Sequence, residues 1–117
     1  MTLINRLMET MMNWTTVCEL DDILPNAGAA VRVGDRQIAI FRVEDELYAI
    51  DNFDPLCNAN IIARGIVGCL NGATVVASPL YKQHFCLNSG QCIEEDDVKL
   101  SVFKVRSNGD SVELQAA

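Results

Sequence analysis

The side chains best suited to metal binding or nucleophilic chemistry are five cysteines and a single histidine. Their closest grouping is His84, Cys86 and Cys92, and on an extended strand His84 and Cys86 would share one face. Cys57 or Cys69 would complete a Cys₃His zinc set, but the spacings are not those of a zinc finger or ribbon. A cysteine nucleophile needs a base across a cleft, and the histidine stands beside the cysteines in sequence instead. We therefore interpret the cysteines as small hydrophobic side chains.

Two other kinds of site also find little support in the residues. The chain has no G-x-G-x-x-G or P-loop motif, and Gly65 and Gly68 fall on a predicted strand. Asp51 and Asp54 are acidic, but they share one loop, and the acidic run 94–97 is typical of a solvated turn. The residues alone therefore define no catalytic constellation.

Short apolar runs separated by turn signals predict an all-β fold, an antiparallel sandwich or barrel built from hairpins. Gly34-Asp35, Asn71-Gly72 and Asn108-Gly109 are expected at hairpin turns. Two irregular segments, 51–64 and 79–83, interrupt the hairpins, and such loops are where function concentrates. The predicted strands are 14–18, 29–33, 36–43, 47–50, 65–70, 74–78, 84–87, 91–93, 104–106 and 112–114, and residues 25–28 are predicted to form a turn.

Length and charge limit the classes of protein to consider. The 117 residues are enough for one domain, expected over 14–117. A net charge of −7 argues against nucleic acid and membrane surfaces as partners. Residues 1–13 carry an apolar stripe at helical spacing, and we interpret them as an N-terminal extension, helical or disordered, or as a sign of a later translation start. No signal peptide or apolar run of about 20 residues is present, which predicts a cytoplasmic protein with free thiols.

The order strand, loop, hairpin, loop resembles the Rieske-like fold, through "AIDNFDP" (49–55), "ARGIVG" (63–68), "VVASPLYKQHFCLNSGQC" (75–92) and "VFKVRSNGDSVEL" (102–114). In Rieske proteins a C-x-H and a C-x-x-H motif, one in each loop, hold a [2Fe–2S] cluster. The second motif usually reads C-P-x-H-G-x-x-F. By this resemblance the four ligand positions hold Asp54, Leu56, Ser78 and Tyr81, so every cluster ligand is missing.

A ligand-free Rieske-like chain with "ASPLYKQHF" is similar to the small subunits of assimilatory NAD(P)H-dependent nitrite reductases, over about residues 14–115. The resemblance implies a cofactor-free subunit of an enzyme that reduces nitrite to ammonium. It also implies that a large subunit carries FAD, an iron–sulfur cluster and siroheme and uses NAD(P)H. It identifies neither the nicotinamide nor the stoichiometry.

The resemblance also suggests roles for the two loops. Asp54 is expected to form an Asx-turn and Ser78 to bind loop amides. We favour Tyr81 as a packing residue that fills the space of the metal, with an exposed contact as the alternative. The candidates for contact with the large subunit are Arg64, Tyr81, Lys82, Gln83 and His84, and the core candidates are Ile66, Val75, Ala77 and Phe85.

Two alternative functions stay open at this point. One is a Rieske-type [2Fe–2S] electron carrier, which would contain iron and absorb visible light. The other is an interaction module that depends on zinc or thiols and uses the cysteines with His84.

Overall fold

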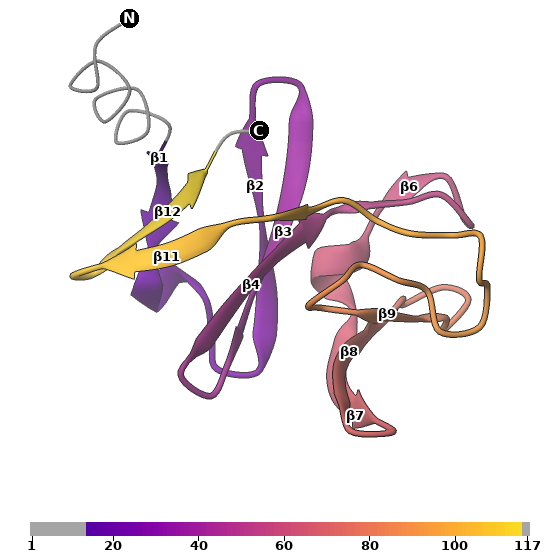
Figure 1. The fold of residues 1–117 in the computed structure, drawn as a ribbon. Helices are drawn as coiled ribbons and strands as arrows, with labels where there is room; N and C mark the ends of the chain where they lie inside the picture. Colours follow the sequence, from indigo (N-terminus) through magenta and orange to yellow (C-terminus); the bar gives the residue numbers. More distant parts are fainter. Residues whose placement is uncertain (1–13, 116–117) are drawn as a thin grey trace, which may run out of the picture.

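The computed structural model describes residues 14–115, so the predicted extension over residues 1–13 lies outside the described residues. Within this range the chain forms short strands and two single-turn 3₁₀ helices (Figure 1). The elements are β1 (Trp14–Glu19), η1 (Leu20–Asp22), β2 (Ala27–Val33), β3 (Arg36–Val43), β4 (Glu46–Asp51), β5 (Phe53–Asp54), β6 (Ala59–Asn60), η2 (Ile62–Arg64), β7 (Ile66–Leu70), β8 (Ala73–Ala77), β9 (His84–Cys86), β10 (Val102–Phe103), β11 (Val105–Asn108) and β12 (Ser111–Gln115).

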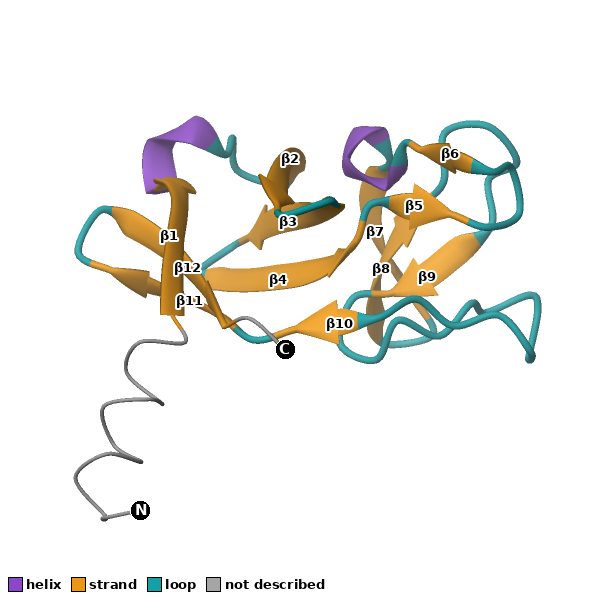
Figure 2. Ribbon diagram, turned by 90° about the horizontal axis from the view of Figure 1, so that it is seen from above, coloured by secondary structure: helices purple, strands orange, loops and turns teal. Residues whose placement is uncertain are grey.

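All strand pairs are antiparallel, as predicted for an all-β fold. Two sheets, with strand orders β1-β12-β11 and β10-β4-β3-β2, form one part of the molecule, which we call the base. The hairpin β5-β6 and the sheet β7-β8-β9 form the other part, which we call the tip (Figure 2). The tip contains both predicted irregular loops.

The predicted turns are largely confirmed. Asn71 and Gly72 have φ angles of 52° and 85°, which is the backbone of a tight two-residue hairpin turn. Three predictions were wrong in detail. The strand β2 already begins at Ala27, and the last hairpin turns at Gly109-Asp110 because Asn108 belongs to β11. Residues 91–93 form only isolated bridges, Cys92 with Phe85 and Gln91 with Lys99. The predicted loop 51–64 contains β5, β6 and η2, which are too short to produce a periodic sequence pattern.

The strand β3 is buried on both faces and separates two hydrophobic clusters. Ile38 and Ile40 face the base cluster, which contains Val112 and Leu114 of β12. Their neighbours Ala39 and Phe41 point the opposite way, as alternation along a strand requires, into the tip cluster. That second cluster also contains Ile62, Val76, Phe85, Leu87 and Cys92. The two parts of the molecule therefore share one central strand.

One glycine sets the distance between base and tip. A Cβ atom on Gly28 of β2 would lie 2.6 Å from the Phe41 ring and 2.7 Å from the Ala63 carbonyl oxygen of η2. No other residue fits there without displacing backbone. Gly28 thus lets η2 pack directly onto β2 and holds the first tip loop against the base.

The core predictions are only partly confirmed. Val75 and Phe85 are buried, and Ala77 is half-buried. Ile66 is 78% exposed, so its assignment to the core was wrong; it lies on β7, the outer strand of its sheet. Over residues 14–115 there is no helix with the length and apolar character needed to cross a membrane.

Candidate functional site

The two irregular loops meet at Asp54, the last residue of β5. Its side chain is fully buried, and its Oδ1 accepts a hydrogen bond of 2.9 Å from the Leu56 amide, which is the predicted Asx-turn. The Ser78 hydroxyl, also buried, donates to Asp54 Oδ2 at 2.5 Å. The prediction that Ser78 would bind loop amides was wrong, because its partner is this carboxyl group. One short hydrogen bond therefore joins the two loops.

This arrangement does not fit a [2Fe–2S] cluster. By the resemblance given above, Asp54 and Ser78 would stand at the positions of the two cysteine ligands, and they bind each other. By the same resemblance, the positions of the two histidine ligands would be those of Leu56, which packs against the tip cluster, and Tyr81. A hydrocarbon side chain has no donor atom for iron, and the cluster needs two thiolates and two imidazoles. No step through an iron–sulfur group is derived from these residues.

Tyr81 lies on the surface and not in the space of a missing metal. Its side chain is 60% exposed, as is that of Leu80, so its favoured assignment as a packing residue was wrong. The turn that carries both residues is closed by two backbone bonds, from Ser78 N–H to the Gln83 carbonyl and from Lys82 N–H to the Ser78 carbonyl. Tyr81 therefore lies on the outer part of a short, closed turn.

Lys82 occupies a backbone position that usually favours glycine. Its φ angle is +62°, and it stands where the C-P-x-H-G-x-x-F pattern places glycine. The turn therefore keeps the backbone shape of the ligand loop while presenting a lysine side chain. Lys82 and Arg64 are both exposed, whereas Gln83 is half-buried, with an amide oxygen that has no hydrogen-bond partner among the described residues.

His84 is held by Glu94 across the tip. Glu94 Oε2 lies 2.6 Å from His84 Nδ1, and Glu94 Oε1 accepts a 2.7 Å bond from the His84 amide. Partial burial alone would raise the pKa of Glu94, but these two bonds from His84 outweigh it and lower the pKa. One residue of the predicted acidic loop, Glu94, thus binds the start of β9. Neither the charge of this loop nor its spacing indicated that role.

The cysteines form no metal site in the part of the chain that the structure describes. No three side chains of His, Cys, Asp or Glu come together there in a metal-binding arrangement. All five thiols are free, and their environments differ: Cys92 is buried and Cys69 is exposed, so the interpretation as buried hydrophobic side chains fails for Cys69. Burial raises the pKa of Cys86, but hydrogen bonds from Ser89 and Asn88 outweigh it and lower the pKa.

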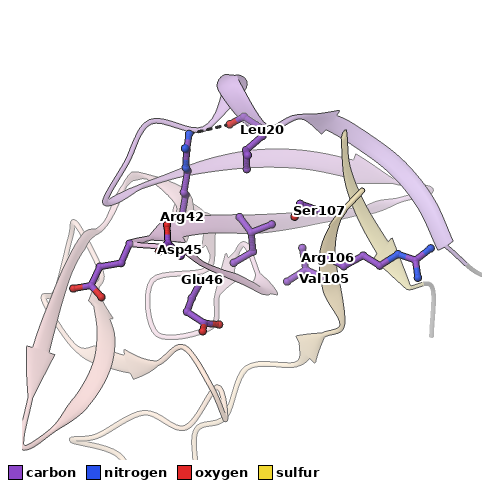
Figure 3. Close-up of a pocket in the computed structure, with 9 residues that line it drawn as sticks. Leu20, Arg42, Asp45, Glu46, Val105, Arg106 and Ser107 are labelled. Atoms are coloured by element: carbon purple, nitrogen blue, oxygen red, sulfur yellow. Dashed lines mark hydrogen bonds between the residues drawn. The ribbon is translucent and has the colours of Figure 1, made fainter. Parts of the chain in front are cut away.

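A polar pocket of about 280 Å³ lies in the base, away from the tip (Figure 3). Arg42 crosses it and donates to the carbonyls of Leu20 and Ile23, at 3.5 and 3.3 Å. Its guanidinium group thereby satisfies the end of η1, which is a structural task. Asp45, Glu46 and Ser107 also line the pocket, but no histidine or cysteine of the described residues does.

Asn52 is a positioning residue of the tip that sequence reasoning missed. It is buried directly before β5, its Oδ1 accepts a 2.7 Å bond from the Ala63 amide, and its Nδ2 donates to Gln37 Oε1. The dipeptide Asp51-Asn52 carried a signal for this role, because the side chains of asparagine and aspartate often form hydrogen bonds with backbone groups of loops. Asn52 thereby connects β3, β5 and η2.

Known proteins are similar to this chain in fold and in sequence. The nitrite reductase (NADH) small subunit of Escherichia coli K12 is 37% identical over 107 residues, which cover 90% of this chain and 99% of the relative. The solution structure of the nitrite reductase [NAD(P)H] small subunit from Erwinia carotovora has a TM-score of 0.77 at 41% identity, covering 90% of this chain and 82% of that one. The nitrite reductase [NAD(P)H] large subunit of Klebsiella oxytoca contains a segment 48% identical over 80 residues, 68% of this chain and 8% of the relative. Residues 13–115 match the model of the Rieske-like [2Fe-2S] domain, and the chain belongs to that family.

Proposed function

We propose that this chain is the cofactor-free small subunit of an NAD(P)H-dependent nitrite reductase. In this assembly a cytoplasmic large subunit would carry FAD, an iron–sulfur cluster and siroheme, and would reduce nitrite to ammonium with electrons from NAD(P)H. The carrying observation is the Asp54–Ser78 hydrogen bond, which occupies the two thiolate positions in a chain that is 37% identical to a nitrite reductase small subunit. A subunit without its own redox centre would support the large subunit by binding it.

The large subunit is the partner favoured by the relatives. In Klebsiella oxytoca the nitrite reductase [NAD(P)H] large subunit itself contains a segment similar to this chain, which supports the large subunit as the partner. A separate chain lacks a covalent tether, so it needs a surface that binds noncovalently. The exposed turn with Leu80, Tyr81 and Lys82 offers apolar area and a positive charge on a chain whose net charge is −7.

We propose that the exposed turn contacts the large subunit, mainly through Tyr81. Arg64 and Lys82 are exposed at the same tip, and they would lie at the rim of the interface with the large subunit. Gln83 and His84 are half-buried, and their proposed role in the contact is to hold the exposed turn in position. Interfaces draw most of their affinity from a few aromatic anchors, which makes Tyr81 the first residue to test.

The test combines copurification with an assay. The purified large subunit is titrated with this chain, and NAD(P)H-dependent nitrite reduction, thermal stability and the Kd of the complex are measured. We expect binding that stabilises the large subunit or raises its rate, and no iron or visible absorption in this chain. Full nitrite reduction that the chain changes in neither rate nor stability would contradict the proposal, and so would a bound iron–sulfur cluster.

Substitutions at Tyr81 locate the contact. Tyr81→Ala is expected to weaken the complex roughly tenfold or more, about 1.4 kcal/mol, while the Tm of the isolated chain stays within about 2 °C. Tyr81→Phe keeps the ring and serves as the matched control, with a Kd close to that of the original chain. If the alanine variant binds as tightly as the phenylalanine variant, the contact lies elsewhere.

A further inference from the structure

The strand β7 has a free hydrogen-bonding edge. Leu70 and Ala73 close the two-residue turn, so they form a hydrogen-bonded pair, and the next such pair along the hairpin is Gly68 with Val75. On its other side β8 bonds to β9, since the Thr74 carbonyl accepts a 3.0 Å bond from the Leu87 amide. The backbone N–H and C=O groups of the odd-numbered residues of β8 therefore point toward β7, and those of the even-numbered residues point toward β9.

It follows that Val67 and Cys69 point their amide and carbonyl groups away from β8. The alternation places them between the bonded residues Ile66, Gly68 and Leu70. The strand pairs with β8 alone, and no other backbone hydrogen bond reaches residues 66–70 among the described residues. Two adjacent sites for strand pairing thus have no backbone partner among the described residues.

Nothing on β7 protects this edge from pairing with another strand. Natural proteins usually protect an open edge with a lysine, a proline or a bulge, and the sequence of β7 is Ile-Val-Gly-Cys-Leu. Ile66 is 78% exposed, and a Cβ atom on Gly68 would meet nothing within 4 Å. The strand therefore presents unpaired main-chain groups beside an exposed apolar side chain and a glycine with open space around it.

We propose that the large subunit adds an extended, uncharged segment to β7 as a fourth strand of the sheet. This inference rests on the proposed function and names how the partner is held. The edge is continuous with the exposed turn, because Ile66 pairs with Ala77, the residue before Ser78. The exposed turn therefore begins directly after the last residue of β8 that pairs with β7.

A second copy of this chain suits the edge less well. Each copy carries a net charge of −7, so two copies repel each other. A ladder of five residues per copy also buries far less than the roughly 1,200 Å² of a stable specific interface. A segment of the large subunit does not have the second limit, because the exposed turn supplies further contact area. The open space above Gly68 leaves room for a side chain of the added strand beside Ile66.

Cys69 provides a test that separates main-chain pairing from side-chain contact. Cys69→Pro removes an outward amide that makes no bond within the hairpin, so the fold is retained. Cys69→Ala removes the same thiol but keeps the amide. We expect the proline variant to bind the large subunit roughly tenfold more weakly than the alanine variant, with both chains folded by circular dichroism. Equal affinities of the two variants would overturn the inference.

Amide hydrogen exchange read residue by residue gives an independent test in the intact complex. In the free chain Val67 and Cys69 should exchange quickly, and Gly68 and Leu70 slowly. In the complex all four should be slow. If the large subunit binds but Val67 and Cys69 stay fast, strand addition is wrong while the proposed function stands; if it does not bind the original chain, the proposed function itself fails. Protection of both amides in the isolated chain at high concentration would assign the edge to a second copy and overturn the inference.

Discussion

The base and the tip use polar and apolar side chains in opposite ways. In the base cluster the buried side chains are apolar, with Ile40 and Val112 fully inaccessible. In the tip the fully buried side chains include Asp54, while Leu80 and Tyr81 are each 60% exposed. The base therefore obtains its stability from its own core. The tip adds a buried polar bond that joins its loops.

The largest expected effect tests the base. Ile40→Ala removes a fully buried side chain between β12 and the central sheet and should lower the free energy of unfolding by about 2–5 kcal/mol. Urea titration followed by circular dichroism measures the change. The matched control is Ile66→Ala, the same substitution at a residue that is 78% exposed, and its cost should be within about 0.5 kcal/mol. Equal costs would mean that the base and the tip do not differ as described.

An intermediate effect tests the bond that joins the tip loops. Asp54→Ala leaves the Ser78 hydroxyl and the Leu56 amide without their partner and should cost about 1–3 kcal/mol. Ser78→Ala should cost a similar amount. The double variant should cost less than the sum of the two, by about 1 kcal/mol or more, because it leaves no orphaned partner across the loops. Strict additivity in chemical denaturation would show that the two side chains do not act together.

The smallest expected effect is a pH dependence. Because the pKa of Glu94 is lowered in the folded chain, its contribution to stability is present above the ordinary value near 4.5 and is lost as the pH falls below it. Glu94→Gln should therefore flatten the decrease in Tm between neutral and acid pH. The effect should be the weakest of the three, since the Glu94 side chain is 41% exposed. Parallel Tm–pH curves for the two chains would contradict this account.

The sequence predicted the base better than the tip. Alternating apolar residues and turn dipeptides such as Gly34-Asp35 identified the hairpins, because a strand with one buried face leaves a period of two. In the tip, the hairpin β7-β8 was also predicted, but β5, β6, η2 and β9 have only two or three residues each, too few to produce a periodic pattern. The Rieske-like motif located Asp54 and Ser78, but only the folded chain reveals that they bind each other.

The exposure of residues in the tip was harder to predict. Tyr81 and Ile66 were interpreted as packing residues because large apolar side chains are usually buried in a self-contained domain. Both are exposed, for different reasons: Tyr81 lies on a turn closed by local backbone bonds between residues 78 and 83, and Ile66 lies on an edge strand. The edge position of β7 cannot be read from neighbouring residues, since it depends on the order of strands in the sheet.

The burial of β3 on both faces has a consequence for how the chain unfolds and is degraded. Because Ile40 and Phe41 close two clusters from one strand, loosening either cluster removes a wall of the other. Unfolding should then be a single cooperative transition, with no intermediate in which the base survives without the tip. In a cell, a weakened copy would be exposed to proteases along its whole length. The amount of the chain in the cell would therefore depend on whether the base and the tip are both intact. Few copies with a folded base and a defective tip would persist.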